Sequence, residues 1–276
     1  MRIIEKRLLT KLYIAAIWIY LVQEKGASTP ARDRYNNDQL LLAAKDGNTS
    51  LVELLLGKGA SIEANNLNDY TALHSAAGGS HSRTVELLVE KGASLEAKDW
   101  GRSTPLHSAA RGGHTRTVEL LAEKGASLEA NGWGGSTPLH LAAHDGHTSM
   151  VELLLEKGVS MEVRDWDGST PLNLAAWRGH THTVELLVEK GASLEAKAWN
   201  DITALHLAAQ YGHTSTVELL LEKGASMAAK TGGGFTPLQL ATNNRRTNTA
   251  ELLKKEAAKL AAYETMIVPF ISEIQR

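Results

Sequence analysis

A four-residue word, Thr-Pro-Leu-His, recurs along this 276-residue chain in steps of 33 residues. Complete or related copies begin at Thr71, Thr104, Thr137, Thr170, Thr203 and Thr236. A second word, Lys-Gly-Ala-Ser or Lys-Gly-Val-Ser, keeps the same step and ends at Ser28, Ser61, Ser94, Ser127, Ser160, Ser193 and Ser226. A compact domain with a single core has no physical reason to repeat itself in this way, whereas a stack of similar units does.

The sequence of each unit predicts two short helices followed by an extended loop, here called the finger. Thr104 is a favourable N-cap, and Pro105 suits the first helical position, where no N–H is needed. Val151, Leu154 and Leu155 share one face of a second helix. Gly158 supplies the left-handed residue that ends that helix. The finger follows over residues 160–168 and contains an Asp-Gly turn.

Helices of seven to ten residues are too short to be stable alone, so the units must stack. We therefore expect an all-α solenoid of helix-turn-helix units with β-hairpin-like fingers. The array covers residues 33–262 in seven units, after a degenerate N-terminal half-repeat or cap over 1–32 and before a C-terminal cap or tail over 263–276. The expected units are 33–65, 66–98, 99–131, 132–164, 165–197, 198–230 and 231–262.

The period, the Thr-Pro-Leu-His word and the Gly-His pair between helices make the array similar to ankyrin repeats. The resemblance implies a concave groove lined by the ends of the first helices, where partner proteins usually bind. It also implies that the repeated histidines join adjacent units by hydrogen bonds. The chain departs from the family pattern at four positions. Ankyrin repeats usually carry Asn after the second helix, whereas this chain has Glu96, Glu129, Glu162 and Glu195.

The terminal parts depart further. The second helix of the last unit is expected to continue through residues 254–262, and the apolar run 266–270, interrupted by Pro269, suggests a C-terminal cap. Residues 12–22 are uniformly apolar and follow a basic stretch. Residues 21–28 repeat the register of 87–94, which favours a capping half-repeat, while a targeting segment or membrane-contacting helix remains the alternative.

Composition and motifs argue against nucleic-acid binding, catalysis, and cofactor or metal binding. The net charge of −2 gives no basic field for nucleic acid, and the chain has no Cys. No phosphate-binding, dinucleotide-binding or hydrolase motif is complete. Nine of the eleven histidines occupy two repeat slots, one per unit in each, which does not make a clustered metal site. We therefore expect no enzyme activity, no cofactor and no metal.

Tryptophan is concentrated at the predicted finger tips. Trp100, Trp133, Trp166 and Trp199, here called the tryptophan row, are each separated by 33 residues. Units about 10 Å apart would keep these rings too distant to stack directly. A row of exposed rings suggests a partner that covers them. Copying by duplication, or packing of each ring on the neighbouring finger, is the alternative.

The ends of the first helices vary within the constant frame, as a recognition surface should. We select Arg111, His144, Trp177, Arg178 and Tyr211, here called the groove residues, as the set that determines specificity. The chain is thus expected to be a monomeric, cytoplasmic scaffold that binds a partner protein and no nucleic acid. Alternatives are a membrane-tethered adaptor that uses residues 12–22, or the repeat tail of a larger receptor or effector.

Overall fold

The computed structural model describes residues 29–274, and side chains over 33–262. The predicted N-terminal half-repeat and the apolar run 12–22 lie outside these residues. The described part contains seven pairs of α-helices and two short 3-10 turns at finger tips. The pairs are α2 (Thr29–Lys45) with α3 (Thr49–Gly57), α4 (Ala72–Gly78) with α5 (Ser82–Glu90), α6 (Pro105–Arg111) with α7 (Thr115–Glu123), α8 (Pro138–His144) with α9 (Thr148–Glu156), α10 (Pro171–Arg178) with α11 (Thr181–Glu189), α12 (Ala204–Tyr211) with α13 (Thr214–Glu222), and α14 (Pro237–Asn243) with α15 (Thr247–Ile274).

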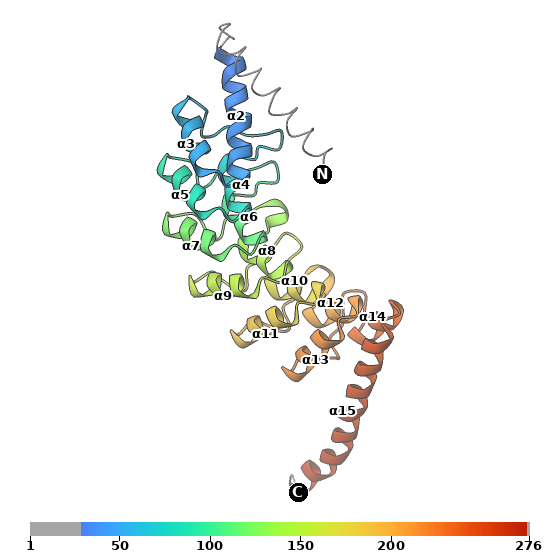
Figure 1. The fold of residues 1–276 in the computed structure, drawn as a ribbon. Helices are drawn as coiled ribbons and strands as arrows, with labels where there is room; N and C mark the ends of the chain where they lie inside the picture. Colours follow the sequence, from blue (N-terminus) through green and yellow to red (C-terminus); the bar gives the residue numbers. More distant parts are fainter. Residues whose placement is uncertain (1–28, 275–276) are drawn as a thin grey trace, which may run out of the picture.

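The helix pairs stack one on the next into a curved, elongated array (Figure 1). The first helices form one layer and the second helices form another, with the fingers projecting from the side of the first helices. The all-α solenoid expected from the sequence is confirmed. Among the described residues the fingers contain no extended strands, and pairing is limited to one isolated bridge between Asn65 and Thr71.

The core runs the length of the array as a repeated pattern rather than as one centre. In the six units before the last, the first helix buries its Leu and two small alanines, as Leu106, Ala109 and Ala110 do in α6. The second helix buries a Val and a Leu, such as Val151 and Leu154 in α9. Small side chains let adjacent first helices approach closely. Because each helix is too short to be stable alone, it depends on this packing within the stack.

Both ends depart from the regular unit. Helix α2 has 17 residues and α15 has 28, whereas the helices between them have seven to nine. The unit limits expected near residues 33 and 262 therefore fall inside helices. Helix α15 continues as predicted through 254–262, and its backbone stays helical past Pro269 to Ile274. Residues 266–270, where the sequence suggests a cap, lie on the part of α15 that projects beyond the stack (Figure 1).

Candidate partner-binding surface

Two sets of histidines join neighbouring units, as the resemblance implied. In the first set, Nδ1 of His107 accepts a hydrogen bond from the Thr104 N–H at 3.1 Å, so the ring proton sits on Nε2 and is donated to the Ser136 carbonyl at 3.1 Å. His74 and His140 make the same links to Ser103 and Ser169. Burial lowers the pKa of His107 to about 4, because the charged ring is poorly solvated there.

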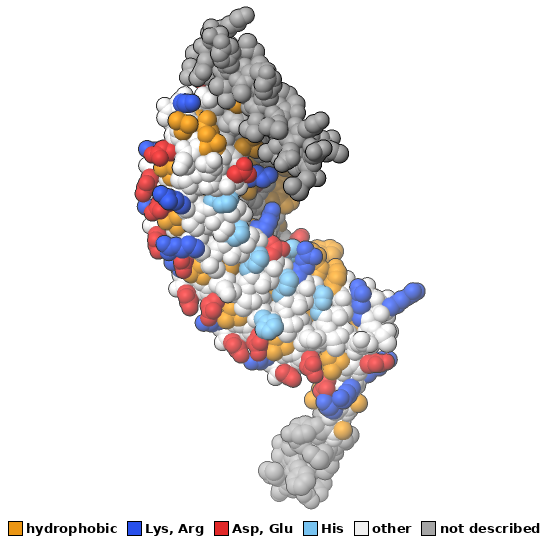
Figure 2. Space-filling view, viewed as in Figure 1, with side chains coloured by type: hydrophobic (Ala, Val, Ile, Leu, Met, Phe, Trp, Pro, Cys, Tyr) orange, Lys and Arg blue, Asp and Glu red, His pale blue; other side chains and the backbone are white. Residues whose placement is uncertain are grey.

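In the five units between the terminal ones, the second set lies between the two helices and binds the preceding unit. Nε2 of His147 lies 2.8 Å from the Arg111 carbonyl, and Nε2 of His180 lies 3.0 Å from the His144 carbonyl. Figure 2 shows pale-blue histidine side chains that follow one another down the stack. Within the described residues no group of three His, Asp, Glu or Cys side chains has the arrangement of a metal site. The predicted structural role of the repeated histidines is confirmed.

Glutamate takes over the role of a connector at the slots where ankyrin repeats usually carry Asn. Oε1 of Glu96 accepts from the N–H of Ser127 at 2.8 Å, and Oε1 of Glu162 accepts from Ser193 at 2.8 Å. The acceptor belongs to one unit and the donor to the next, so the longer side chain joins successive units. The sequence showed the replacement but not this partner.

The finger tips are held by backbone hydrogen bonds between units. The Trp166 N–H donates to the Gly134 carbonyl at 2.7 Å, and the Trp199 N–H donates to the Asp167 carbonyl at 2.7 Å. Each finger is closed by a further bond, such as that from the Asp165 N–H to the Ser169 carbonyl at 3.1 Å. The tip residues therefore have a fixed spacing that does not depend on their side chains.

The tryptophan row is exposed on this frame. Trp100, Trp133, Trp166 and Trp199 are 75%, 67%, 73% and 75% exposed. Leu67 occupies the same slot one unit earlier and is fully exposed, so it extends the row. The sequence reasoning missed Leu67, although its position 33 residues before Trp100 was a sufficient signal.

One expectation about the row is wrong. The rings of Trp100 and Trp133 stack, with centroids 6.2 Å apart and planes at 19°. The expectation used the distance between helices, but a Trp side chain is long enough to lean along the stack toward its neighbour. Trp166 leans in a related way over the preceding finger, where a Cβ on Gly135 would lie 2.5 Å from the indole Cδ1. Packing on neighbouring fingers thus covers part of these rings and leaves most of their area in solvent.

Four of the five groove residues, His144, Trp177, Arg178 and Tyr211, form a connected cluster on the first helices. Trp177 lies at the centre, with its ring 5.4 Å from His144 and 6.0 Å from Tyr211 between centroids. The guanidinium carbon of Arg178 lies 5.2 Å from the Trp177 ring centroid, and its Nε donates to Nε2 of His144 at 3.0 Å. Nδ1 of His144 is then left to donate to Asp145, 2.6 Å away. The cluster crosses from α8 to α12, so three units hold it in place.

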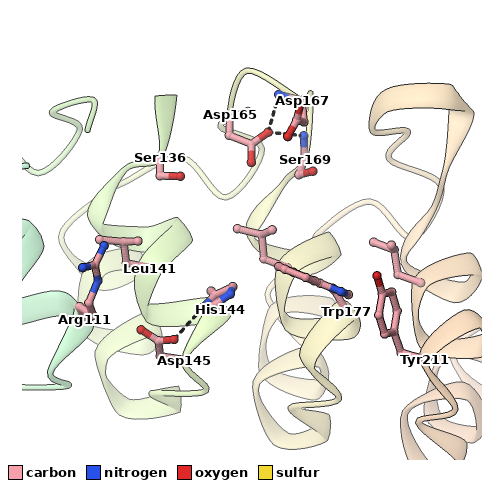
Figure 3. Close-up of a pocket in the computed structure, with 12 residues that line it drawn as sticks. Arg111, Ser136, Leu141, His144, Asp145, Asp165, Asp167, Ser169, Trp177 and Tyr211 are labelled. Carbon is pink, nitrogen blue, oxygen red and sulfur yellow. Dashed lines mark hydrogen bonds and ion pairs between the residues drawn. The ribbon is translucent and has the colours of Figure 1, made fainter. Parts of the chain in front are cut away.

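A hollow of about 500 Å³ opens above this cluster, between the first helices and the fingers (Figure 3). Arg111, His144, Trp177 and Tyr211 line it from the helices, and Asp165 and Asp167 line it from a finger. Arg178 contacts two of the lining residues without lining the hollow itself. The tryptophan row does not line it either, so the predicted residues form two surfaces, one in the groove and one on the tips.

Comparisons with known proteins agree with this geometry. A family model of ankyrin repeats matches residues 40–132, 129–198 and 194–263. The crystal structure of the human ASB11 ankyrin repeat domain has a TM-score of 0.71 and 28% sequence identity, covering 78% of this chain and 95% of that chain. The search of curated protein sequences gave no match. The family model covers most of the chain, and the protein belongs to the ankyrin repeat family.

Proposed function

We propose that this protein is a non-catalytic scaffold that binds a partner protein through its finger tips and its concave groove. The tips contribute the tryptophan row, and the groove contributes Arg111, His144, Trp177, Arg178 and Tyr211. Ankyrin repeats are in general protein–protein interaction modules, and they are typically non-catalytic. This general role is the starting point for assigning the two surfaces.

The exposed tryptophan row is the observation that carries the proposal. Burying one exposed Trp of roughly 200 Å² is worth on the order of 5 kcal/mol as an upper bound. Four such rings on a frame held by backbone hydrogen bonds offer a partner a large apolar area at little ordering cost. Trp is also among the residues that most often dominate binding energy at interfaces.

The groove supports the same function by a different feature. Trp, Arg and Tyr are the three residue types most enriched at binding hot spots, and the groove contains one of each in Trp177, Arg178 and Tyr211. Their mutual contacts hold these side chains in place before binding. The hollow beside them is open and lined by groups of both charges. Such a site suits a side chain or loop of a partner, and it would determine which partner is accepted.

No specific observation favours the membrane-tethered alternative. None of the helices in the described range 29–274 is long and apolar enough to cross a membrane. The residues on which that alternative rests, 12–22, lie outside the described part.

A capture experiment with three forms of the protein tests the proposal. Wild type, a tip variant with all four tryptophans changed to Ala, and a groove variant with Trp177→Ala and Tyr211→Ala are immobilised in equal amounts and exposed to cell extract. Circular dichroism first establishes that all three are equally folded. We expect proteins that wild type retains and the tip variant loses, with a subset lost by the groove variant. Identical sets of retained proteins would contradict the proposal.

A further inference from the structure

We propose that the tips recognise an extended peptide segment that carries arginine at about every third residue. This inference rests on the proposed function, because it names the kind of partner that the tip surface takes. It follows from four features of the tips: their apolar row, their charge, the chemistry of Trp beside carboxylates, and their spacing.

The apolar row gives the surface its direction. Leu67, Trp100, Trp133, Trp166 and Trp199 come from five successive fingers and are all at least 67% exposed. The next finger has Gly232 in this slot, so the row ends at Trp199. A narrow row that spans five units fits a segment laid along the stack better than a globular surface that touches one finger.

The charge of the tips is negative. Residues 66–69, 99–102, 132–135, 165–168 and 198–201 contain five aspartates and a single cation, Arg102. The aspartates are Asp69, Asp99, Asp165, Asp167 and Asp201, of which Asp165 and Asp167 also line the groove hollow. Several hold their own turn through one carboxylate oxygen, as Asp165 does by accepting from the Ser169 N–H, which leaves the other oxygen for a ligand.

The basic residues nearest the tips offset only part of this charge. Nη1 of Arg164 donates to the carbonyls of Gly168 and Lys197, at 2.8 and 2.6 Å, so this cation is held against the backbone at the base of the finger. Nζ of Lys197 lies 3.5 Å from Asp201 and offsets the charge of that carboxylate, whereas Lys98 is opposed by Glu96 two residues away. A cationic ligand therefore meets a complementary surface.

Arginine is the cation that fits best. Its planar guanidinium stacks on an aromatic ring and pairs with a carboxylate at the same time, whereas the compact lysine ammonium is more strongly hydrated. The groove already shows the aromatic part of this arrangement, because the Arg178 guanidinium lies 5.2 Å from the Trp177 centroid while its Nε donates to His144. At the tips the tryptophans have aspartates as close neighbours in sequence, directly beside Trp100 and Trp166 and two residues after Trp199.

The spacing selects an extended backbone. Stacked units repeat at about 8–10 Å, the distance between packed helices. An extended chain advances about 3.3 Å per residue, and a polyproline II helix about 9.3 Å in each three-residue turn. One residue in three therefore meets each successive tip, whereas an α-helix would need about six residues to cover the same distance.

Titration calorimetry with designed peptides tests the inference. The probe is a twelve-residue peptide of four Arg-Pro-Ala repeats with blocked ends. Matched peptides replace every Arg by Lys, replace every Arg by Gln, or place the four arginines together. We expect the spaced arginine peptide to bind at least fivefold more tightly than the Lys and clustered peptides, and the Gln peptide to show no measurable binding. Equal binding by the Gln peptide would show that proline or apolar contact alone is recognised and would overturn the inference.

Protein variants locate the peptide on the tips. Trp133→Ala with Trp166→Ala is expected to weaken binding of the spaced peptide at least tenfold. Asp167→Asn with Asp201→Asn is expected to weaken it at least threefold and to reduce its dependence on salt. The control changes two exposed carboxylates of the second helices, Glu218→Gln and Glu251→Gln, and should stay within twofold of wild type. A loss in the control equal to that in the aspartate variant would overturn the inference.

The two proposals fail in different ways. If the tip variant loses captured proteins but the spaced peptide does not bind wild type, the arginine-bearing segment is wrong while the scaffold function stands. If the capture experiment also shows no difference between wild type and the tip variant, the proposed function fails as well.

Discussion

The buried histidine in the Thr-Pro-Leu-His word is the residue on which stacking depends most directly. His107 must stay neutral, because Nδ1 accepts from Thr104 and Nε2 donates to Ser136. Burial lowers its pKa to about 4, and burial also lowers the pKa values of His74, His140 and His206. The folded state therefore binds fewer protons than the unfolded chain between pH 4 and 6.5. The stability from these links is complete above pH 6.5 and is lost as the pH falls toward 4.

The variant His107→Asn tests this argument with a residue that the chain already uses in the same slot. Asn173 accepts from the Thr170 N–H and lies buried as His107 does. We expect His107→Asn to cost less than about 1 kcal/mol at pH 7 and to reduce the loss of stability between pH 7 and 4.5 by about 2 kcal/mol. Urea unfolding at both pH values measures this. An unchanged pH dependence would show that His107 is not the titrating group.

A second residue-scale prediction concerns the glutamate connectors. Removing the Glu162 side chain leaves the Ser193 N–H, which it holds at 2.8 Å, without its protein acceptor. We expect Glu162→Ala to lower the free energy of unfolding by about 1 kcal/mol, since the donor is exposed and water replaces the acceptor in part. The matched control is Glu218→Ala, an exposed glutamate of the second helix, which should change stability by less than about 0.5 kcal/mol. Equal losses of unfolding free energy in the Glu162→Ala and Glu218→Ala variants would show that Glu162 does not connect the units.

At the scale of elements, the period predicted the helices and their register because it records which positions meet a neighbour in the stack. It also located the tip tryptophans, while the resemblance to ankyrin repeats implied where the groove residues lie. It did not predict the stacking of Trp100 on Trp133, because the direction in which a side chain leans depends on its rotamer and not on its register. The lengths of α2 and α15 also escaped prediction, since terminal elements lack the neighbour that defines the unit.

Two glycines of the same unit allow the cost of a clash with the neighbouring unit to be distinguished from the cost of backbone strain. Gly113 and Gly125 both have left-handed backbone, with φ of +69° and +95°. A Cβ on Gly113 would lie 2.6 Å from the His147 ring of the next unit, whereas a Cβ on Gly125 meets nothing within 4 Å. We expect Gly125→Ala to cost about 1 kcal/mol from strain, and Gly113→Ala to cost at least about 1 kcal/mol more. Equal losses in thermal or urea unfolding would mean that the histidine moves aside freely.

At the scale of the whole molecule, stability is a sum over units and their interfaces. Deleting residues 132–164 removes one complete period and joins two positions in the same register. We expect this shortened chain to fold with the same helical circular dichroism per residue and a lower free energy of unfolding. Deleting residues 132–148 instead breaks the register and should prevent the units on either side from stacking. Equal behaviour of the two deletions would contradict the stacked-unit account.

The curved stack also explains how the protein presents a long exposed surface along one side. The fingers and first helices lie on one side, while charged side chains gather along the edge formed by the second helices (Figure 2). Folding uses the buried leucines, alanines and histidines, so the tips are free to vary without loss of the core. The account therefore separates residues needed for stability from residues proposed for binding.

That separation is the central claim, and the double variant Trp133→Ala with Trp166→Ala tests it most directly. Urea unfolding and binding to a partner recovered in the capture experiment are measured on the same preparation. Because these rings are 67% and 73% exposed, we predict a change in the free energy of unfolding below about 1 kcal/mol and a loss of binding of at least about 2 kcal/mol. Equal losses of folding and binding would contradict the account and make the tryptophan row part of the packing.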